Sequence, residues 1–144
     1  GANCAFEDCL EFARLLDRHG RPASRDMAEP FAEIERLRRP NAEAIAQMAL
    51  ENYTEMRDTV RDERFARLKT LSLLLEQRHP QRFIPRYSMV MFHAEIPYAE
   101  ALRRGALQQQ ILDEVDRLGA ASLASLALAD KLIAERLPPL VAEP

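Results

Sequence analysis

Apolar residues recur at spacings of three and four along most of the chain, which is the period of an amphipathic α-helix. The first such run lies within the opening twenty residues, where the apolar face consists of Phe6, Cys9, Leu10, Ala13 and Leu16. Asn3 precedes this run as a plausible N-cap, and Gly20 follows it as a natural C-terminal stop. The pattern therefore predicts a first helix over about residues 4–19.

The same period continues in five further segments. The six predicted helices span about residues 4–19, 24–38, 41–58, 62–78, 98–118 and 122–137. Pro30 falls inside the second range, so this helix can begin as late as Pro30, with the proline in its first turn. Pro40 is expected to end the second helix, and Asn41 to cap the third. The fold class predicted is mostly α.

One stretch departs from the helical pattern. Residues 82–98 read RFIPRYSMVMFHAEIPY, with Pro85 and Pro97 near its ends. Tyrosine, valine, methionine and phenylalanine between residues 87 and 92 favour extended structure. We expect one short extended segment near residues 83–93.

A polar residue interrupts the apolar stripe of the third predicted helix. The stripe consists of Ile45, Ala49, Met56 and Val60. Asn52 falls on it, at a position where a helix facing a core normally carries an apolar side chain. From the spacing alone, Asn52 is either a buried amide satisfied by neighbouring backbone or a ligand-binding group in a dry pocket.

Composition and charge narrow the class of protein. The 144 residues are 47% hydrophobic and 30% charged, which is typical of a globular domain. Acidic residues outnumber basic ones by 23 to 20, so the chain lacks the basic surplus of a nucleic-acid-binding protein. The longest uncharged run, residues 119–129, is too short to span a bilayer, and no signal peptide begins the chain. Two cysteines five positions apart imply no disulfide, so we expect a soluble cytoplasmic protein.

Motifs for phosphate, metal or nucleophile chemistry are absent from the sequence. The four glycines are too far apart to form GxGxxG or a P-loop. The three histidines lie in separate elements without cysteine or carboxylate partners at ligand spacing, so no metal site is predicted. No catalytic residue is predicted in this chain either.

Three stretches carry a resemblance to a known family. The opening GANCAFEDC is similar to the last flavin-contacting motif of FAD-dependent aromatic hydroxylases, a Gly-Met-Asn followed by Phe-Glu-Asp, although Ala2 stands where the family usually has methionine. The stretches RRPNAEAIAQMALENYTEMRD and HPQRFIPRYSMVMFHAEIPYAEALRRG resemble the C-terminal half of the kynurenine 3-monooxygenase family. The resemblance covers about residues 1–112, and the tail beyond Leu112 carries little of it.

The resemblance implies a division of the chain and a reaction. Residues 1–20 correspond to the last flavin motif and its following helix, and residues 21–144 to a helical region that covers the substrate. The complete enzyme uses FAD and NADPH to hydroxylate L-kynurenine at its ring 3-position, in tryptophan catabolism. The GxGxxG motif of the FAD domain would lie upstream, so the chain alone is expected to hold no cofactor and to be inactive. The apolar face of the first helix is expected to dock on that missing domain and to be partly uncovered without it.

The resemblance also implies roles for individual residues. Asn52 and Tyr87 match the positions that bind the amino-acid end of kynurenine, and Ala2 and Asn3 would offer backbone N–H groups to the flavin. Glu55 follows Asn52 by one turn and could hold the aniline amine or orient Asn52, or it could be an ordinary solvated carboxylate. Met56, beside it, is expected to form pocket wall or core.

Two interpretations of the whole chain follow. The first is the C-terminal segment of a kynurenine-hydroxylating flavoenzyme, with L-kynurenine and the missing FAD domain as partners and with homodimer formation left open. The second is a free-standing helical interaction module derived from such an enzyme. Neither interpretation involves nucleic acid, and the tail shows no hydrophobic segment that could anchor the chain to a membrane.

Overall fold

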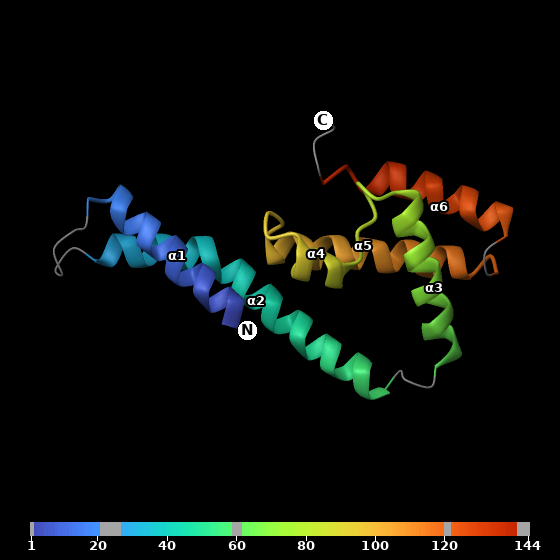
Figure 1. Cartoon of the computed structure of the whole chain (residues 1–144), viewed down its shortest axis with the longest axis horizontal. Helices are drawn as coiled ribbons and strands as arrows, with labels where there is room; N and C mark the ends of the chain where they lie inside the picture. The colour runs from blue at the N-terminus through green and yellow to red at the C-terminus, as the bar shows by residue number, and fades with distance from the viewer. Residues whose placement is uncertain (1, 21–26, 59–61, 120–121, 141–144) are drawn as a thin grey trace. The chain divides into compact units, whose positions relative to one another are not determined.

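Helix is the only regular secondary structure in the residues that the computed structural model describes, which are 2–20, 27–58, 62–119 and 122–140. These residues form α1 (Ala2–Arg18), α2 (Ala28–Asp58), α3 (Glu63–Arg78), α4 (Arg86–Phe92), α5 (Tyr98–Asp116) and α6 (Leu123–Arg136) (Figure 1). The predicted mostly α class is confirmed. The helices group into two compact units, Gly1–Tyr53 and Thr54–Pro144, and the division falls within the last turns of α2.

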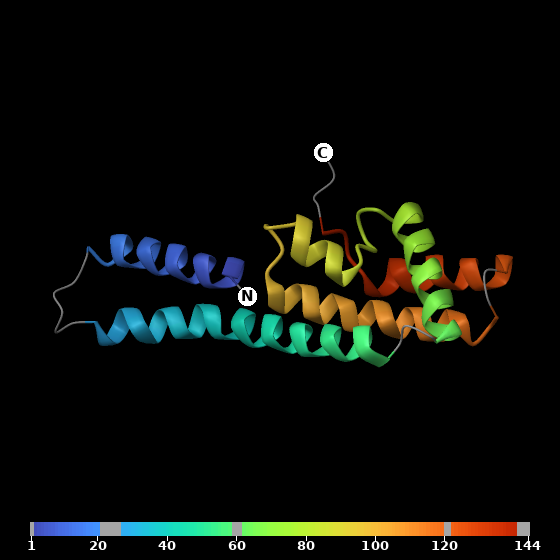
Figure 2. The same cartoon turned by 60° about the horizontal axis from the view of Figure 1, so that its bottom comes forward.

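The first unit is an antiparallel pair made by α1 and the larger part of α2, which lie side by side in both views (Figures 1 and 2). The rings of Phe12 and Phe31 stack with their centroids 5.5 Å apart. Near the other end of the pair, Arg38 donates from Nε to Asp8 at 2.5 Å and from Nη2 to Glu7 at 3.2 Å. Gly20 has a φ of +70° two residues after the last residue of α1, which confirms it as the C-terminal stop.

The helix pair leaves one face of α1 uncovered. Cys4 and Leu15 are buried, whereas Phe6 is 73% exposed and Leu10 is also exposed. Helical spacing places Phe6 and Leu10 on the side of α1 opposite to Leu15, so α2 alone cannot cover both sides. The partly uncovered side that the sequence predicts is present at Phe6 and Leu10, with Leu16 half-buried, and docking on a further domain stays a prediction. The predicted N-cap at Asn3 is wrong, because α1 already begins at Ala2.

A single helix replaces the predicted second and third helices. α2 begins at Ala28 and continues through Pro40, so the predicted break at Pro40 and the predicted cap at Asn41 are wrong. A proline inside a helix removes one backbone donor, but the turns on either side keep their own hydrogen bonds. Burial of Ala44 and Met48 directly after Pro40 stabilises the continuation. Pro30 lies in the first turn of α2, as predicted.

The second unit has its core between α3, α5 and α6. α5 and α6 run antiparallel, and α3 crosses them steeply (Figures 1 and 2). The buried residues of this core are Leu75, Phe83, Ile111, Leu112, Val115, Ala129, Leu132, Ile133 and Leu137. After α6 the chain returns to the start of the loop before α4, where the N–H of Leu140 donates to the carbonyl of Gln81 at 2.9 Å. The tail beyond Leu112 is therefore an integral part of this core.

The predicted extended segment near residues 83–93 is wrong over most of its length, because Arg86–Phe92 form the helix α4. Residues 83–85 are irregular, and Pro85 is the N-cap. The carbonyl of Pro85 accepts from the N–H of Met89 at 3.0 Å and so closes the first turn. Met89 is buried in a small cluster with Ile84, Ile96 and Ala101. In the helix, Met89 is buried and Val90 packs against the same cluster, while Tyr87, Met91 and Phe92 stay exposed. This packing outweighs the preference of these residues for strands.

Candidate substrate-contacting residues

Tyr87 lies on the open side of α4. It is the second residue of this helix, and its side chain is 65% exposed. Met91, one turn further along α4, is also exposed, whereas Met89 between them is buried in the small cluster. The phenol is thus presented outward by a helix whose opposite side is anchored in the core. A tyrosine in this setting can donate a hydrogen bond to a carboxylate and pack its ring on an apolar neighbour.

The other predicted substrate residues lie together at the end of α2. Asn52 is exposed, Met56 is 68% exposed and Glu55 is half-buried. Spacings of three and four residues place Glu55 and Met56 one turn beyond Asn52 on neighbouring sides of the helix. Among the described residues Asn52 is neither a buried core amide nor enclosed in a dry pocket, so its ligand-binding role stays a prediction.

The buried stripe of α2 also differs from the predicted one. Ala44 and Met48 are buried, whereas Ile45 is half-buried and Ala49 is exposed. Asn52 is one turn beyond Met48, on the same side of the helix. Met48 is buried, whereas the described residues leave Asn52 exposed. Asn52 belongs to the first unit, while Glu55, Met56 and Tyr87 belong to the second.

Ala2 and Asn3 form the first turn of α1. Both are exposed, and the first turn carries no acidic residue. The backbone N–H groups of a first turn have no partner inside the helix, and the helix dipole gives this end a partial positive charge. These two residues therefore suit an acceptor or an anion better than a cation.

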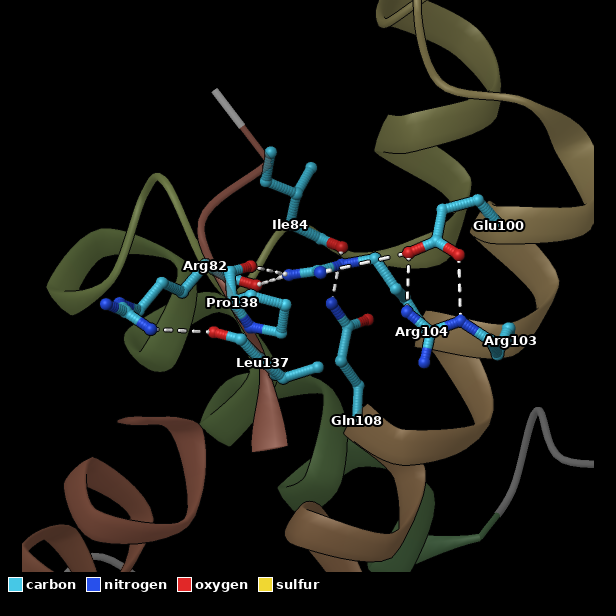
Figure 3. Close-up of polar contacts among 8 residues, drawn as sticks. All are labelled: Arg82, Ile84, Glu100, Arg103, Arg104, Gln108, Leu137 and Pro138. Carbon is cyan, nitrogen blue, oxygen red and sulfur yellow. Dashed lines mark hydrogen bonds and ion pairs between the residues drawn. The ribbon is translucent and has the colours of Figure 1, made fainter. Parts of the chain in front are cut away.

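A polar cluster that the sequence analysis did not identify bonds the backbone a few residues before Tyr87. Arg104 and Gln108 are one turn apart on α5, and their side chains are 1% and 4% exposed. Arg104 donates from Nη2 to the carbonyls of Arg82 at 2.7 Å and Pro138 at 2.9 Å, and Gln108 donates from Nε2 to that of Ile84 at 2.8 Å (Figure 3). The signal was present in the sequence, because both polar residues share a helix face with the apolar Ala101 and Ile111.

The charged group of this cluster is the buried Arg104 guanidinium, which donates hydrogen bonds to backbone carbonyls. Burial lowers the pKa of the Arg104 guanidinium from its ordinary value, and Glu100, 3.9 Å from Nη1, opposes that effect. Glu100 itself pairs with Arg103, and this hydrogen bond lowers the pKa of the Glu100 carboxyl. Nε of Arg104 is buried without a hydrogen-bond partner among the described residues. The buried Arg104 guanidinium therefore holds the carbonyls of Arg82 and Pro138 in place.

Cys4 and Cys9 are both free thiols in the described residues. Cys4 is buried in the helix pair, and burial together with Asp8 and Glu7 raises the pKa of its thiol, although Arg38 acts in the opposite direction. Cys9 is exposed. A raised pKa leaves less thiolate at neutral pH, so Cys4 is a poor nucleophile.

A cavity of about 300 Å³ lies between α3 and α5, lined mainly by apolar side chains that include Leu71, Leu74 and Val115. None of the predicted substrate or flavin residues lines it. Among the described residues, no helix combines the length and apolar character that crossing a bilayer requires.

Comparison with known proteins relates the chain to one group of enzymes. It is 47% identical over 130 residues to a kynurenine 3-monooxygenase of Stenotrophomonas maltophilia (strain K279a), which covers 85% of this chain and 27% of the relative. It is 45% identical over 142 residues to a kynurenine 3-monooxygenase of Xanthomonas oryzae pv. oryzae (strain PXO99A), which covers 97% of this chain and 30% of the relative. No family model matches the chain.

The second match carries the aligned range well beyond Leu112, so the similarity is not confined to residues 1–112. This agrees with the contribution of α6 and Leu137 to the core of the second unit. The chain spans less than a third of the length of these relatives, as expected for the C-terminal segment that the motifs indicate. The chain is therefore a homologue of one segment of the kynurenine 3-monooxygenases.

Proposed function

We propose that this chain is the substrate-covering segment of an FAD- and NADPH-dependent monooxygenase that converts L-kynurenine to 3-hydroxykynurenine. Asn52 and Tyr87 hydrogen-bond the amino-acid end of the substrate, and Met56 supplies apolar wall. The observation that carries the proposal is the 45–47% identity to enzymes named kynurenine 3-monooxygenase along almost the whole chain. The exposure of Asn52, Tyr87 and Met56 supports it, since none of these side chains is enclosed by the core of its own unit.

The chemistry of these side chains suits an amino acid. An amide offers two donors and an acceptor, so Asn52 can serve either the carboxylate or the ammonium group, and the Tyr87 hydroxyl can donate to the carboxylate. Glu55 is half-buried and adds a negative charge one turn from Asn52. It either accepts from an amine of the substrate or orients the Asn52 amide.

The cofactor of the complete enzyme would meet this chain at the start of α1. Ala2 and Asn3 fit an acceptor edge of the flavin because they are exposed first-turn residues with no acidic neighbour in that turn. FAD, reduced by NADPH, supplies the oxygen-activating chemistry when it is bound. The chain's own residues bind and orient the substrate, as is usual where a cofactor performs the reaction. With no glycine-rich phosphate cradle in its 144 residues, this chain supplies only part of the flavin site.

The test grafts this chain onto a complete enzyme. In the Xanthomonas oryzae relative, the matching 142 residues are replaced by this sequence, and Asn52→Leu and Tyr87→Phe are made in the resulting chimaera. Each variant loses one hydrogen bond to a charged group, worth about 1.5–3 kcal/mol. We expect L-kynurenine to bind about 10- to 150-fold more weakly, as measured by titrating the flavin spectrum, with little change in melting temperature.

Tyr53→Phe is the matched control, because Tyr53 is 66% exposed and stands directly beside Asn52. This variant also removes one hydroxyl from an exposed tyrosine, and substrate affinity should not change. An Asn52→Leu enzyme that binds L-kynurenine as tightly as its parent would reject the role of Asn52. A chimaera that is stable, holds FAD and hydroxylates nothing would favour the interaction-module interpretation.

A further inference from the structure

We infer that Gln108, Gly105 and Arg104 of α5 are positioning residues for Tyr87, which they set by fixing the segment that leads into α4. The inference rests on the proposed role of Tyr87. It concerns three residues that contact the backbone or side chains of residues 82–86 and do not themselves need to meet the substrate.

The starting point is that α4 cannot fix its own position. It has seven residues, and no side chain caps its N-terminus. A helix of two turns is marginal in water, so its placement depends on tertiary contacts. Met89 anchors one side of α4 in the small cluster with Ile84, Ile96 and Ala101. Val90 packs against the same cluster, so these anchors lie in the middle of α4, and the first turn that carries Tyr87 needs a constraint of its own.

Two hydrogen bonds from α5 provide this constraint at the entry to α4. Gln108 donates from Nε2 to the carbonyl of Ile84 at 2.8 Å, and Arg104 donates from Nη2 to the carbonyl of Arg82 at 2.7 Å (Figure 3). Buried carbonyls require donors, and residues 83–85 are irregular and form no strand or helix that would provide them. The two donors therefore fix the backbone on both sides of Phe83, whose side chain is fully buried.

The same Arg104 nitrogen also bonds the carbonyl of Pro138 at 2.9 Å, and Arg82 donates from Nη1 to the carbonyl of Leu137 at 2.9 Å. Hydrogen bonds thus join the segment before α4 both to α5 and to residues 137–138, which follow α6. A single Arg104 side chain spans both segments, which an apolar residue of the same volume could not do.

Gly105 sets how closely α5 approaches the first residue of α4. A Cβ at position 105 would lie 2.7 Å from Cδ and 3.1 Å from Cβ of Arg86, the residue directly before Tyr87. Glycine inside a helix costs about 1 kcal/mol relative to alanine, so its presence in the middle of α5 requires a packing reason. The close approach of Arg86 is that reason. Adding one methyl group would displace Arg86 and, with it, the first turn that carries Tyr87.

The test uses the full-length chimaera and two independent changes. Gln108→Met keeps the length of the side chain and removes the bond to Ile84, and Gly105→Ala adds the methyl group. Each is made with Tyr87 present and again with Tyr87→Phe, and L-kynurenine affinity and melting temperature are measured. With Tyr87 present, we expect each change to weaken binding about tenfold, which is the scale of one hydrogen bond. In the Tyr87→Phe background we expect less than about a twofold change, because the hydroxyl being positioned is gone.

Gln110→Met serves as the matched control on the same helix, since Gln110 is exposed and should affect neither measurement. If Gln108→Met does not fold, Gly105→Ala carries the test, because it adds a single methyl group whose nearest neighbours lie in the Arg86 side chain and it keeps the helix propensity of α5. Variants that lower the melting temperature but leave affinity unchanged would overturn the inference. Equal losses of affinity in both Tyr87 backgrounds would overturn it as well. If Tyr87→Phe alone leaves affinity unchanged, the proposed role of Tyr87 fails together with the inference.

Discussion

Asp130 is the residue at which the structure gives the clearest pH dependence. Its carboxylate accepts from Nη2 of Arg78 at 2.7 Å and contacts Nε2 of His79 at 2.7 Å, so it joins the end of α3 to α6. The hydrogen bond from Arg78, aided by that from His79 and opposed by slight burial, lowers the pKa of the Asp130 carboxyl. A lowered pKa in the folded state means that the contribution to stability is present above the ordinary aspartate pKa and is lost in acid.

We therefore predict that Asp130→Asn lowers the free energy of unfolding near neutral pH. The loss should stay below about 1 kcal/mol, because Asp130 is partly exposed and solvent screens the pair. The difference from the parent chain should disappear as the pH falls from about 4 to about 2. Urea denaturation followed by circular dichroism at several pH values measures it. Arg78→Gln should lower the free energy of unfolding in the same way. The double variant should lose less free energy of unfolding than the two single variants together. If Asp130→Asn lowered the free energy of unfolding equally at every pH, the effect could not come from the charge of Asp130.

At the scale of elements, the continuous α2 yields a prediction about Pro40. Proline in a helix interior destabilises the helix by about 3 kcal/mol relative to alanine. Its rigidity lowers the conformational entropy of the unfolded chain, which offsets up to about 1 kcal/mol of this. Pro40→Ala should therefore raise the free energy of unfolding of the first unit by about 2 kcal/mol, as measured by urea denaturation of the whole chain.

Pro30 is the internal control for this element. It lies in the first turn of the same helix, where a proline breaks no hydrogen bond. Because Pro30 is also buried, Pro30→Ala should give no stabilisation. If Pro40→Ala did not stabilise the chain either, α2 would have to be interrupted at Pro40 in solution, as the sequence pattern alone suggested.

At the scale of the whole molecule, the exposed apolar side of α1 predicts association. Phe6 and Leu10 lie one turn apart on that side, and Phe31 of α2 is exposed as well. Apolar patches of this kind bind other apolar surfaces. We expect the isolated chain to bind a hydrophobic dye or to form dimers, and Phe6→Ser with Leu10→Ser to abolish either behaviour while α1 remains helical.

Leu123→Ser is the control, because Leu123 is also exposed but is the first residue of α6, in the other unit. Single exposed apolar residues are common on protein surfaces and should leave dye binding unchanged. A strictly monomeric chain that melts sharply and ignores the dye would contradict the prediction and support a self-contained helical module.

Short-range features of the fold could be predicted from the sequence because their causes are local. The helical period, the glycine stop at Gly20 and the proline in the first turn at Pro30 depend only on neighbouring residues. The resemblance to the kynurenine 3-monooxygenases was likewise legible in contiguous motifs. The candidate residues Asn52 and Tyr87 came from those motifs, and their roles stay predictions.

Tertiary packing decided the features for which the local signals were misleading or silent. Pro40 signals a helix end, yet burial of Ala44 and Met48 continues the helix past it. Strand-favouring residues surround Met89, yet the packing of Met89 and Val90 against the small cluster favours the helix α4. Arg104 and Gln108 share a helix face with apolar residues, but only the fold shows that they bond the carbonyls of residues 82 and 84. In each case the deciding contacts join residues distant in sequence, whose burial energy exceeds the small local propensities.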